Sequence, residues 1–179
     1  VIGGVVADGG ADQNAKLIVD NSTLNVSSWL SVGRGNGVGG VSSDLVATNG
    51  AVITAKDMSA GFNGGNAANM PKGTITLSDT SSLTLNGNFH LAESSGSDMT
   101  MTLNGSARLL NPSTTTKDVG FLGKGTLNIS DSSSVRFGNA ITYVGYRTGT
   151  GVVNITGGFL GNAGEVRVGG LDPRRSTRE

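Results

Sequence analysis

Gly73-Thr-Ile-Thr-Leu-Ser-Asp-Thr-Ser-Ser-Leu-Thr-Leu85 returns 52 residues later as Gly125-Thr-Leu-Asn-Ile-Ser-Asp-Ser-Ser-Ser-Val-Arg-Phe137. A related stretch begins midway between them at Met99, and another lies one step beyond at Gly151, so the period over the middle of the chain is 26 residues. A fixed period of about 20 to 50 residues is typical of repeat architectures. The sequence therefore predicts a protein built from stacked, similar units.

Each repeat contains three short stretches in which apolar and polar residues alternate. In the repeat that starts at Gly73 they are Thr74–Leu77, Leu83–Leu85 and Phe89–Leu91, separated by Ser, Asp, Asn and Gly. A period of two indicates half-buried strands, and the separating residues are typical of tight turns. An antiparallel sandwich would also give many short strands, but it would not require the same sequence to return at a fixed interval. We therefore predict an all-β fold, a parallel β-helix (β-solenoid) of about six coils, each with three short strands and a roughly triangular cross-section.

The same triplet of strands can be traced, less regularly, in the other five repeats. The expected strands are Leu17–Val19, Leu24–Val26 and Trp29–Gly33; Leu45–Ala47, Ala51–Ala55 and Met58–Gly61; Met99–Leu103, Ala107–Leu110 and Val119–Gly123; Gly125–Ile129, Val135–Phe137 and Ile141–Gly145; Val152–Ile155, Phe159–Leu160 and Glu165–Gly169. Two expected loops, Phe62–Lys72 and Asn111–Lys117, interrupt the pattern. The solenoid is thus expected to span residues 16–170. Residues 1–15 would form a preceding partial coil or an N-terminal extension, and residues 171–179 a C-terminal tail or linker.

The third strand of each coil ends in a small residue, which suggests a corner where a larger side chain does not fit. These residues are Gly33, Gly61, Ala92, Gly123, Gly145 and Gly169. Aligning them places one outward-facing column along the solenoid: Ser31, Ser59, His90, Phe121, Tyr143 and Arg167. His90, Phe121 and Tyr143 would then form an exposed aromatic strip, a platform for sugar rings or for a partner protein. The alternative is that the fourth coil is out of phase and Phe121 points inward beside Gly120.

Composition excludes several classes of function. The chain has 13 basic and 13 acidic residues, so it lacks the surplus of Lys and Arg with which proteins bind nucleic acid or anionic membranes. No apolar run approaches the roughly 20 residues that span a bilayer. Cysteine is absent, which fits a reducing cytosol and equally an extracellular repeat protein whose stability comes from stacked strands rather than from disulfides.

Catalytic and metal-binding patterns are also missing from the sequence. Asp79 and Asp131 occupy equivalent turns two coils apart, but Gly105 lies between them and Ser-Asp-Ser is an ordinary turn sequence. His90 is the only histidine, and no calcium loop is present. Threonine pairs such as Thr74 and Thr76 recur on adjacent coils, an arrangement that can bind ice, but the ladder decays after three coils. We expect no catalytic residue, no cofactor and no metal.

A resemblance to known proteins adds to this interpretation. Gly125-Thr-Leu-Asn-Ile-Ser, Tyr143-Val-Gly-Tyr and Thr148-Gly-Thr-Gly-Val-Val-Asn-Ile-Thr-Gly-Gly resemble bacterial extracellular β-solenoid repeats, which occur in autotransporter passenger domains and large surface adhesins. The resemblance covers roughly residues 16–170 and implies an extracellular or cell-surface location. Neither end of the sequence resembles a cap, so we expect the strand edges to be covered by further coils or by copies stacked end to end. The protein would then be a structural or adhesive module that forms a rod or fibre. The alternative is a module that binds or degrades polysaccharide on one outer face; glycans or surface proteins would then be its partners.

Overall fold

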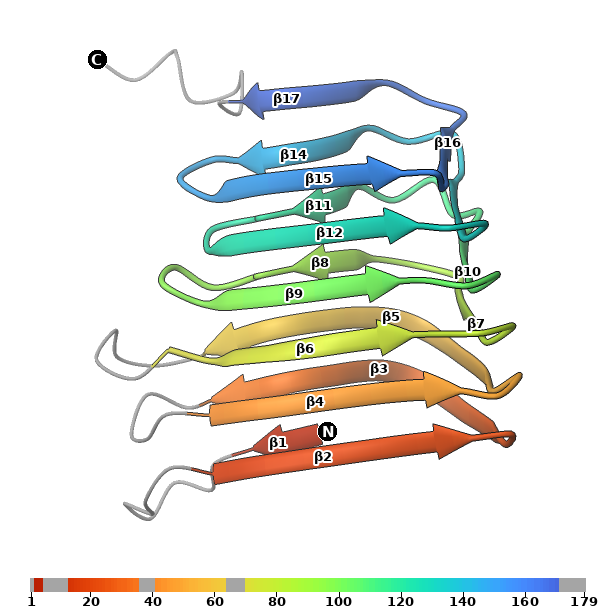
Figure 1. The fold of residues 1–179 in the computed structure, drawn as a ribbon. Helices are drawn as coiled ribbons and strands as arrows, with labels where there is room; N and C mark the ends of the chain where they lie inside the picture. Colours follow the sequence, from red (N-terminus) through yellow and green to blue (C-terminus); the bar gives the residue numbers. More distant parts are fainter. Residues whose placement is uncertain (1, 5–12, 36–40, 64–69, 171–179) are drawn as a thin grey trace, which may run out of the picture.

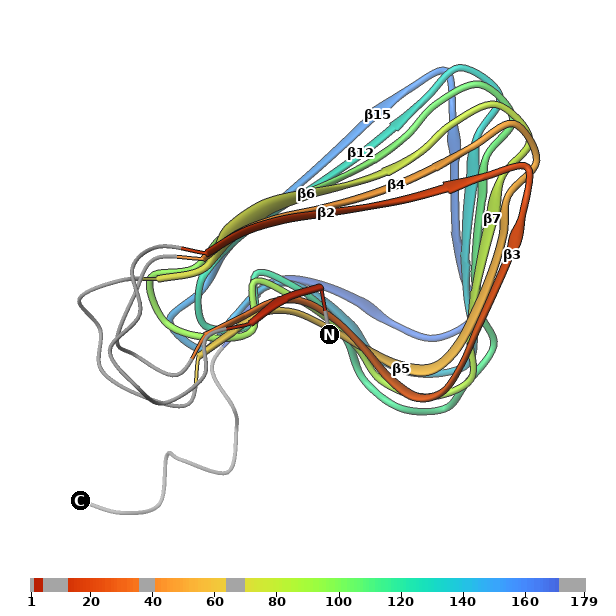
Figure 2. The same cartoon turned by 90° about the horizontal axis from the view of Figure 1, so that it is seen from below.

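The computed structural model describes residues 2–4, 13–35, 41–63 and 70–170, and every regular element in these ranges is a β-strand. The strands stack along one axis from β2 to β17 (Figure 1). Seen along that axis, the coils superpose and enclose a three-sided outline (Figure 2). All pairings between the strands are parallel. The predicted parallel β-solenoid of about six coils is therefore confirmed.

Each coil contributes one strand to a six-stranded sheet and the rest of its strands to a second sheet. The six first strands are β2 (Gln13–Asp20), β4 (Val41–Thr48), β6 (Lys72–Leu77), β9 (Asp98–Leu103), β12 (Lys124–Ser130) and β15 (Thr150–Thr156). In the first two coils the second and third strands are continuous, as β3 (Thr23–Gly35) and β5 (Val52–Asn63). In the later coils they are separate: β7 (Ser82–Leu85), β8 (Phe89–Leu91), β10 (Arg108–Asn111), β11 (Lys117–Val119), β13 (Ser134–Phe137), β14 (Thr142–Tyr146), β16 (Phe159–Asn162) and β17 (Val166–Gly170). A short strand, β1 (Ile2–Gly4), pairs with the free side of β3.

The register follows the 26-residue period where the sequence is regular. Leu127 of β12 lies opposite Met101 on one side and Val153 on the other. Between the first and second strands the chain turns through a residue with positive φ, supplied by Asn49, Asp79, Gly105, Asp131 and Gly157 in successive coils. Asn, Asp and Gly adopt this left-handed conformation at the lowest energetic cost. The Asn, Asp and Gly residues that the sequence places in these turns therefore determine where each coil turns its first corner.

The interior is a single stack of aliphatic columns. Like residues lie above one another because each strand pairs with its counterpart one coil away, about 4.8 Å along the axis. Ile75, Met101 and Leu127 form one such column, and Leu83, Leu109 and Val135 form another. All six are buried in the same hydrophobic cluster. This burial is the main favourable term that holds the coils together.

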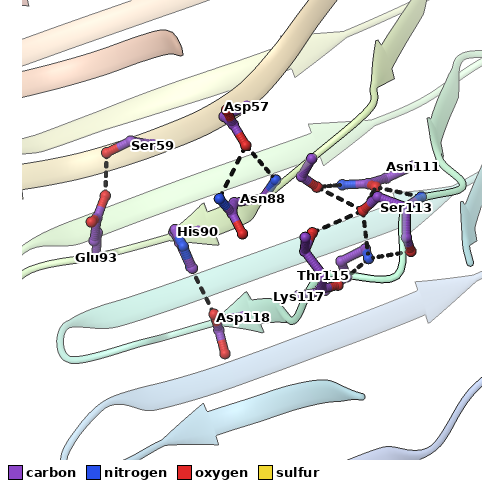
Figure 3. Close-up of polar contacts among 11 residues, drawn as sticks. Asp57, Ser59, Asn88, His90, Glu93, Asn111, Ser113, Thr115, Lys117 and Asp118 are labelled. Atoms are coloured by element: carbon purple, nitrogen blue, oxygen red, sulfur yellow. Dashed lines mark hydrogen bonds and ion pairs between the residues drawn. The ribbon is translucent and has the colours of Figure 1, made fainter. Parts of the chain in front are cut away.

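Two inward positions of the fourth coil are polar, and both anchor the loop between them. Lys117 is fully buried next to Phe89 of the third coil, and its ammonium donates hydrogen bonds to Ser113 O (2.8 Å), to Ser113 Oγ (3.0 Å) and to the carbonyl of Thr115. Asn111, also buried, donates to the carbonyl of Gly87 (3.0 Å) and accepts from Ser113 Oγ (2.7 Å) (Figure 3). Burial lowers the pKa of Lys117 to about 8, although the charge of Asp118 acts in the opposite direction. The loop that the sequence predicts at Asn111–Lys117 is thus tied into the core at both ends.

Some expected segments lie outside the described residues. They are the tail at 171–179, most of the expected N-terminal segment 1–15, and the central part of the expected loop Phe62–Lys72.

Candidate binding groove on the outer face

The outward column of the third strands differs from the sequence prediction at one position. Strand pairing places Ser31, Ser59, His90, Asp118, Tyr143 and Arg167 in register. The column therefore contains Asp118 where Phe121 was expected. The expected strand Val119–Gly123 is wrong, because the observed strand β11 is Lys117–Val119.

The error comes from the corner residue of the fourth coil. The corner residues have positive φ: Gly33, Gly61, Ala92, Gly120, Gly145 and Gly169. The sequence alignment favours Gly123, which directly precedes the first strand of the next coil, over Gly120. Two signals in the sequence point to Gly120 instead: it lies close to one period before Gly145, and Val119-Gly120-Phe121 repeats as Val144-Gly145-Tyr146.

Phe121 lies one residue beyond the corner, in a second column that the sequence reasoning missed. Arg34 and Phe62 are paired there in the first two coils, and Phe121 and Tyr146 follow the corner glycines of the fourth and fifth coils. Phe121 is partly exposed, and its ring centroid lies 5.2 Å from that of His90 and 5.4 Å from that of Tyr146. It therefore faces outward. The alternative is right that the fourth coil is out of phase, but wrong that Phe121 points inward.

The two columns, together with Trp29 of β3, bring five rings together in an aromatic band. Trp29 stacks on His90 at a centroid distance of 6.5 Å with planes 16° apart, and Tyr143 lies 4.2 Å from Tyr146. With the contacts of Phe121, the band runs continuously in the order Trp29, His90, Phe121, Tyr146 and Tyr143. The structure thus brings His90, Phe121 and Tyr143 together in one band and adds Trp29 and Tyr146, but the strip is less exposed than the sequence predicts, because Tyr143 is only 6% exposed. Offset and tilted ring pairs of this kind contribute stabilising free energy beyond that expected from their buried area.

His90 is held by a buried carboxylate. Its Nδ1–H donates to Asp118 Oδ2 at 2.7 Å, and the Asp118 side chain is only 1% exposed (Figure 3). Burial lowers the pKa of His90, but the hydrogen bond and charge of Asp118, with the charges of Glu93 and Asp57, outweigh it and raise the pKa above the ordinary value. Asp118 Oδ1 is buried without a hydrogen-bond partner among the described residues. The Asp118 carboxylate therefore orients the His90 ring through Oδ2 and favours its protonated form.

Two arginines border the band at its C-terminal end. Arg147 lies over the rings of Phe121 (5.2 Å to the centroid) and Tyr146 (5.4 Å). Arg167 donates two hydrogen bonds of 2.8 Å to Glu165 and one of 3.3 Å to Tyr143 Oη. The hydrogen bond from Arg167 lowers the pKa of Glu165. Guanidinium groups stacked on aromatic faces keep their N–H edges available for ligands.

These side chains surround an open groove of about 390 Å³. Polar residues of the third and fourth coils, among them Asn88, Thr116 and Asp118, line it together with Phe121, Tyr143 and Tyr146 and both arginines. The groove is a concave site with convergent polar groups and aromatic walls, which are the usual attributes of a binding site.

Other candidate residues have structural roles. Asp79 accepts hydrogen bonds from Thr48 Oγ1 (2.7 Å) and the Asn49 amide (3.2 Å) of the preceding coil, and these bonds lower its pKa. Asp131 accepts from the Gly105 amide at 2.9 Å, so both carboxylates hold adjacent turns together. The threonine column at Thr74, Thr100 and Thr126 ends at Val152. Within the described residues no group of three or more His, Cys, Asp or Glu side chains is arranged to hold a metal.

The fold defines the class of protein: the chain is a parallel β-solenoid repeat protein. No protein-family model, no curated protein and no solved structure matches it. Among the described residues no helix is long and apolar enough to cross a membrane.

The His90–Asp118 pair predicts a pH dependence of stability. A raised pKa means that the native state binds the His90 proton more tightly than the unfolded state does. This stabilisation is fully present below the unfolded pKa of about 6.5 and is lost as the pH rises through the folded pKa. Urea unfolding of the wild type and of His90→Gln between about pH 5 and pH 9 measures it. We expect the advantage of the wild type to shrink as pH rises; an advantage that is constant or grows would contradict the ion pair.

Proposed function

We propose that this chain is a structural and adhesive module of the cell exterior, a solenoid rod that extends by end-to-end stacking. The proposal rests on the exposure of apolar side chains in the last described coil. Ile155 and Val168 occupy inward columns, opposite the core residues Ile129 and Val144, yet they are 49% and 81% exposed. In the coils below, the same columns are buried. The final described coil therefore presents an apolar end face.

This end face also carries unpaired backbone groups. β15, β16 and β17 are edge strands in the described part of the chain. Exposed parallel edges are templates for pairing with another strand, and repeat proteins protect them with caps or with further repeats. Such a face has apolar side chains at its centre and unpaired backbone N–H and C=O groups along its edges. It is therefore complementary to another coil with the same geometry.

A second copy can supply that coil. The first coil presents its own inward apolar residues, Leu17, Leu24 and Val26, which are only partly buried. They lie on the part of its edge that β1 leaves open, since β1 pairs only with Val32 and Arg34 of β3. A contact between the last coil of one molecule and the first coil of another joins two different surfaces. Such a head-to-tail contact does not close on itself, so it generates a filament. The resemblance of the repeats to those of bacterial surface proteins supports a location outside the cell.

Charged substitutions on β15 test the stacking interface. We expect Ile155→Lys to abolish concentration-dependent association, because it buries a charge in the interface between copies. Val152→Lys is the matched control: Val152 lies on the same strand and is 37% exposed, but it faces outward opposite Thr126. Sedimentation velocity over a range of concentrations measures both, and circular dichroism confirms folding. Equal association of the two variants, or a wild type that never associates, would contradict the proposal.

A second candidate function, binding of a linear saccharide, is favoured by the aromatic band. The groove offers flat rings for the C–H faces of sugars and polar groups for their hydroxyls. Its lining comes from the third to the sixth coil, which spans about 14 Å at a strand spacing of about 4.8 Å. A peptide would not bind there by adding a strand, because the groove lies on the face of a sheet whose strands are paired. Titration of the wild type with neutral and acidic oligosaccharides tests this function, and absence of binding to all of them would contradict it.

A further inference from the structure

We propose that the groove selects acidic saccharides and that Arg147 binds the carboxylate of a uronic acid residue. The inference rests on the saccharide-binding function proposed above and adds the chemical class of the ligand. It follows from the charges that surround the groove and from which of them are already paired.

Most of the charged groups at the groove have partners within the protein. His90 is paired with Asp118, and Arg167 is held by both oxygens of Glu165. Arg147 differs: among the described residues its guanidinium contacts only the faces of Phe121 and Tyr146 and meets no carboxylate. Among the described residues that line the groove, Arg147 is therefore the one charged side chain without a charged partner, and it lies beside the aromatic band.

The backbone holds Arg147 in place. Its amide donates to the carbonyl of Gly170 (3.0 Å), and its φ of 54° belongs to the tight turn after β14. A guanidinium stacked on two rings has its orientation restricted, so little freedom is lost when it binds a ligand. Its planar fork of N–H groups matches a carboxylate in a two-bond arrangement, which is shorter and stronger than neutral hydrogen bonds.

The buried Asp118 determines where an anion can bind. Its carboxylate is already paired with His90 and is 1% exposed, so it offers an anion nothing, whereas Arg147 is exposed and meets no carboxylate among the described residues. A sugar ring with one carboxylate satisfies both conditions. Its acidic group would pair with Arg147, its ring would pack against the parts of the Phe121 and Tyr146 rings that Arg147 leaves open, and its hydroxyls would face Thr116 and Asn88. A polyanion with a charge on every face, such as a nucleic acid, would meet Asp118 and Glu165 as well.

Three oligosaccharide probes of similar length test the inference by isothermal titration calorimetry with the full chain: an oligogalacturonate, its methyl ester and a cello-oligosaccharide. The ester keeps the rings and removes the charge. We expect the acid to bind at least roughly tenfold more tightly than the ester, because hydrogen bonds to charged groups contribute about 1.5–3 kcal/mol. Arg147→Gln is expected to lower the affinity for the acid to that for the ester, and Arg147→Lys to give an intermediate value.

Arg34→Gln is the matched control. Arg34 is also exposed and stacks on a ring, that of Phe62 at 4.6 Å, but it does not line the groove. Its replacement is expected to leave all three affinities unchanged. Equal binding of acid and ester would overturn the role of Arg147 while the saccharide function stands. Binding to none of the probes would overturn the saccharide function itself.

Discussion

Phe89→Ala is expected to lower the free energy of unfolding by about 3–5 kcal/mol, the loss typical of a buried phenylalanine replaced by alanine. Phe89 is fully buried in the third coil, between Met58 of the second coil and Lys117 of the fourth. Its ring centroid lies 5.4 Å from that of Phe137. Adjacent coils are paired continuously by their backbones, so they cannot close around the cavity that the substitution leaves. Urea unfolding followed by circular dichroism measures the effect.

Phe159→Ala is the matched control for this substitution. Phe159 lies on the outer side of β16, is 48% exposed and contacts Arg136 at 4.9 Å. We expect its removal to cost less than about 1 kcal/mol, as for most exposed positions. If the two substitutions cost the same, Phe89 would not belong to the core, and the column assigned to it would be wrong.

Gly120→Ala is expected to destabilise the protein by about 2–5 kcal/mol, because two costs combine. The residue has a φ of 77°, which costs an alanine roughly 1–2 kcal/mol. A β-carbon there would also lie 2.2 Å from the carbonyl oxygen of Thr150, a backbone atom at the start of β15. Relief of such overpacking adds roughly 1–3 kcal/mol. Thermal and urea unfolding of the purified variant measure the loss.

Gly169→Ala separates these two costs. Gly169 occupies the same corner of the last coil with a φ of 69°, but a β-carbon there would meet nothing within 4 Å. We expect only the conformational cost, about 1–2 kcal/mol. Gly120→Ala should therefore be clearly the more harmful of the two; the reverse order would show that Gly120 is not the corner that contacts the start of β15.

The sequence predicts the fold well because the fold depends on repetition. Strands such as Leu83–Leu85 and Phe89–Leu91 alternate clearly, and the Asp79 and Asp131 turns recur at the same place in their coils. Parallel stacking places equivalent residues of successive coils next to one another. The same requirement therefore produces both the repeat in the sequence and the stack of coils in the structure.

The fourth coil is predicted less well for a physical reason. Its third strand begins with Lys117, a charged residue at an inward position, which breaks the apolar alternation. The side chain is accommodated only because the carbonyls of the neighbouring loop accept its hydrogen bonds, a compensation that no local pattern reveals. The alternation therefore places the corner at Gly123 and assigns Phe121 to the position that Asp118 occupies.

The candidate site is predicted in part. His90 and Tyr143 are placed in the right column because their own coils are regular. Asp118 is missed because a buried carboxylate paired with His90 depends on contacts between coils. Tyr146 is missed because it follows the corner, outside the strand alternation. The repeated pairs Gly61-Phe62, Gly120-Phe121 and Gly145-Tyr146 are the sequence signal that identifies this second column.

The proposed function of a rod that extends end to end is tested most directly by negative-stain electron microscopy of the wild-type chain at increasing concentration. Stacking of the last coil on the first predicts filaments one solenoid wide, whose length grows with concentration. Ile155→Lys should yield only short particles under the same conditions. Short, discrete particles of the wild type at every concentration would contradict the proposal.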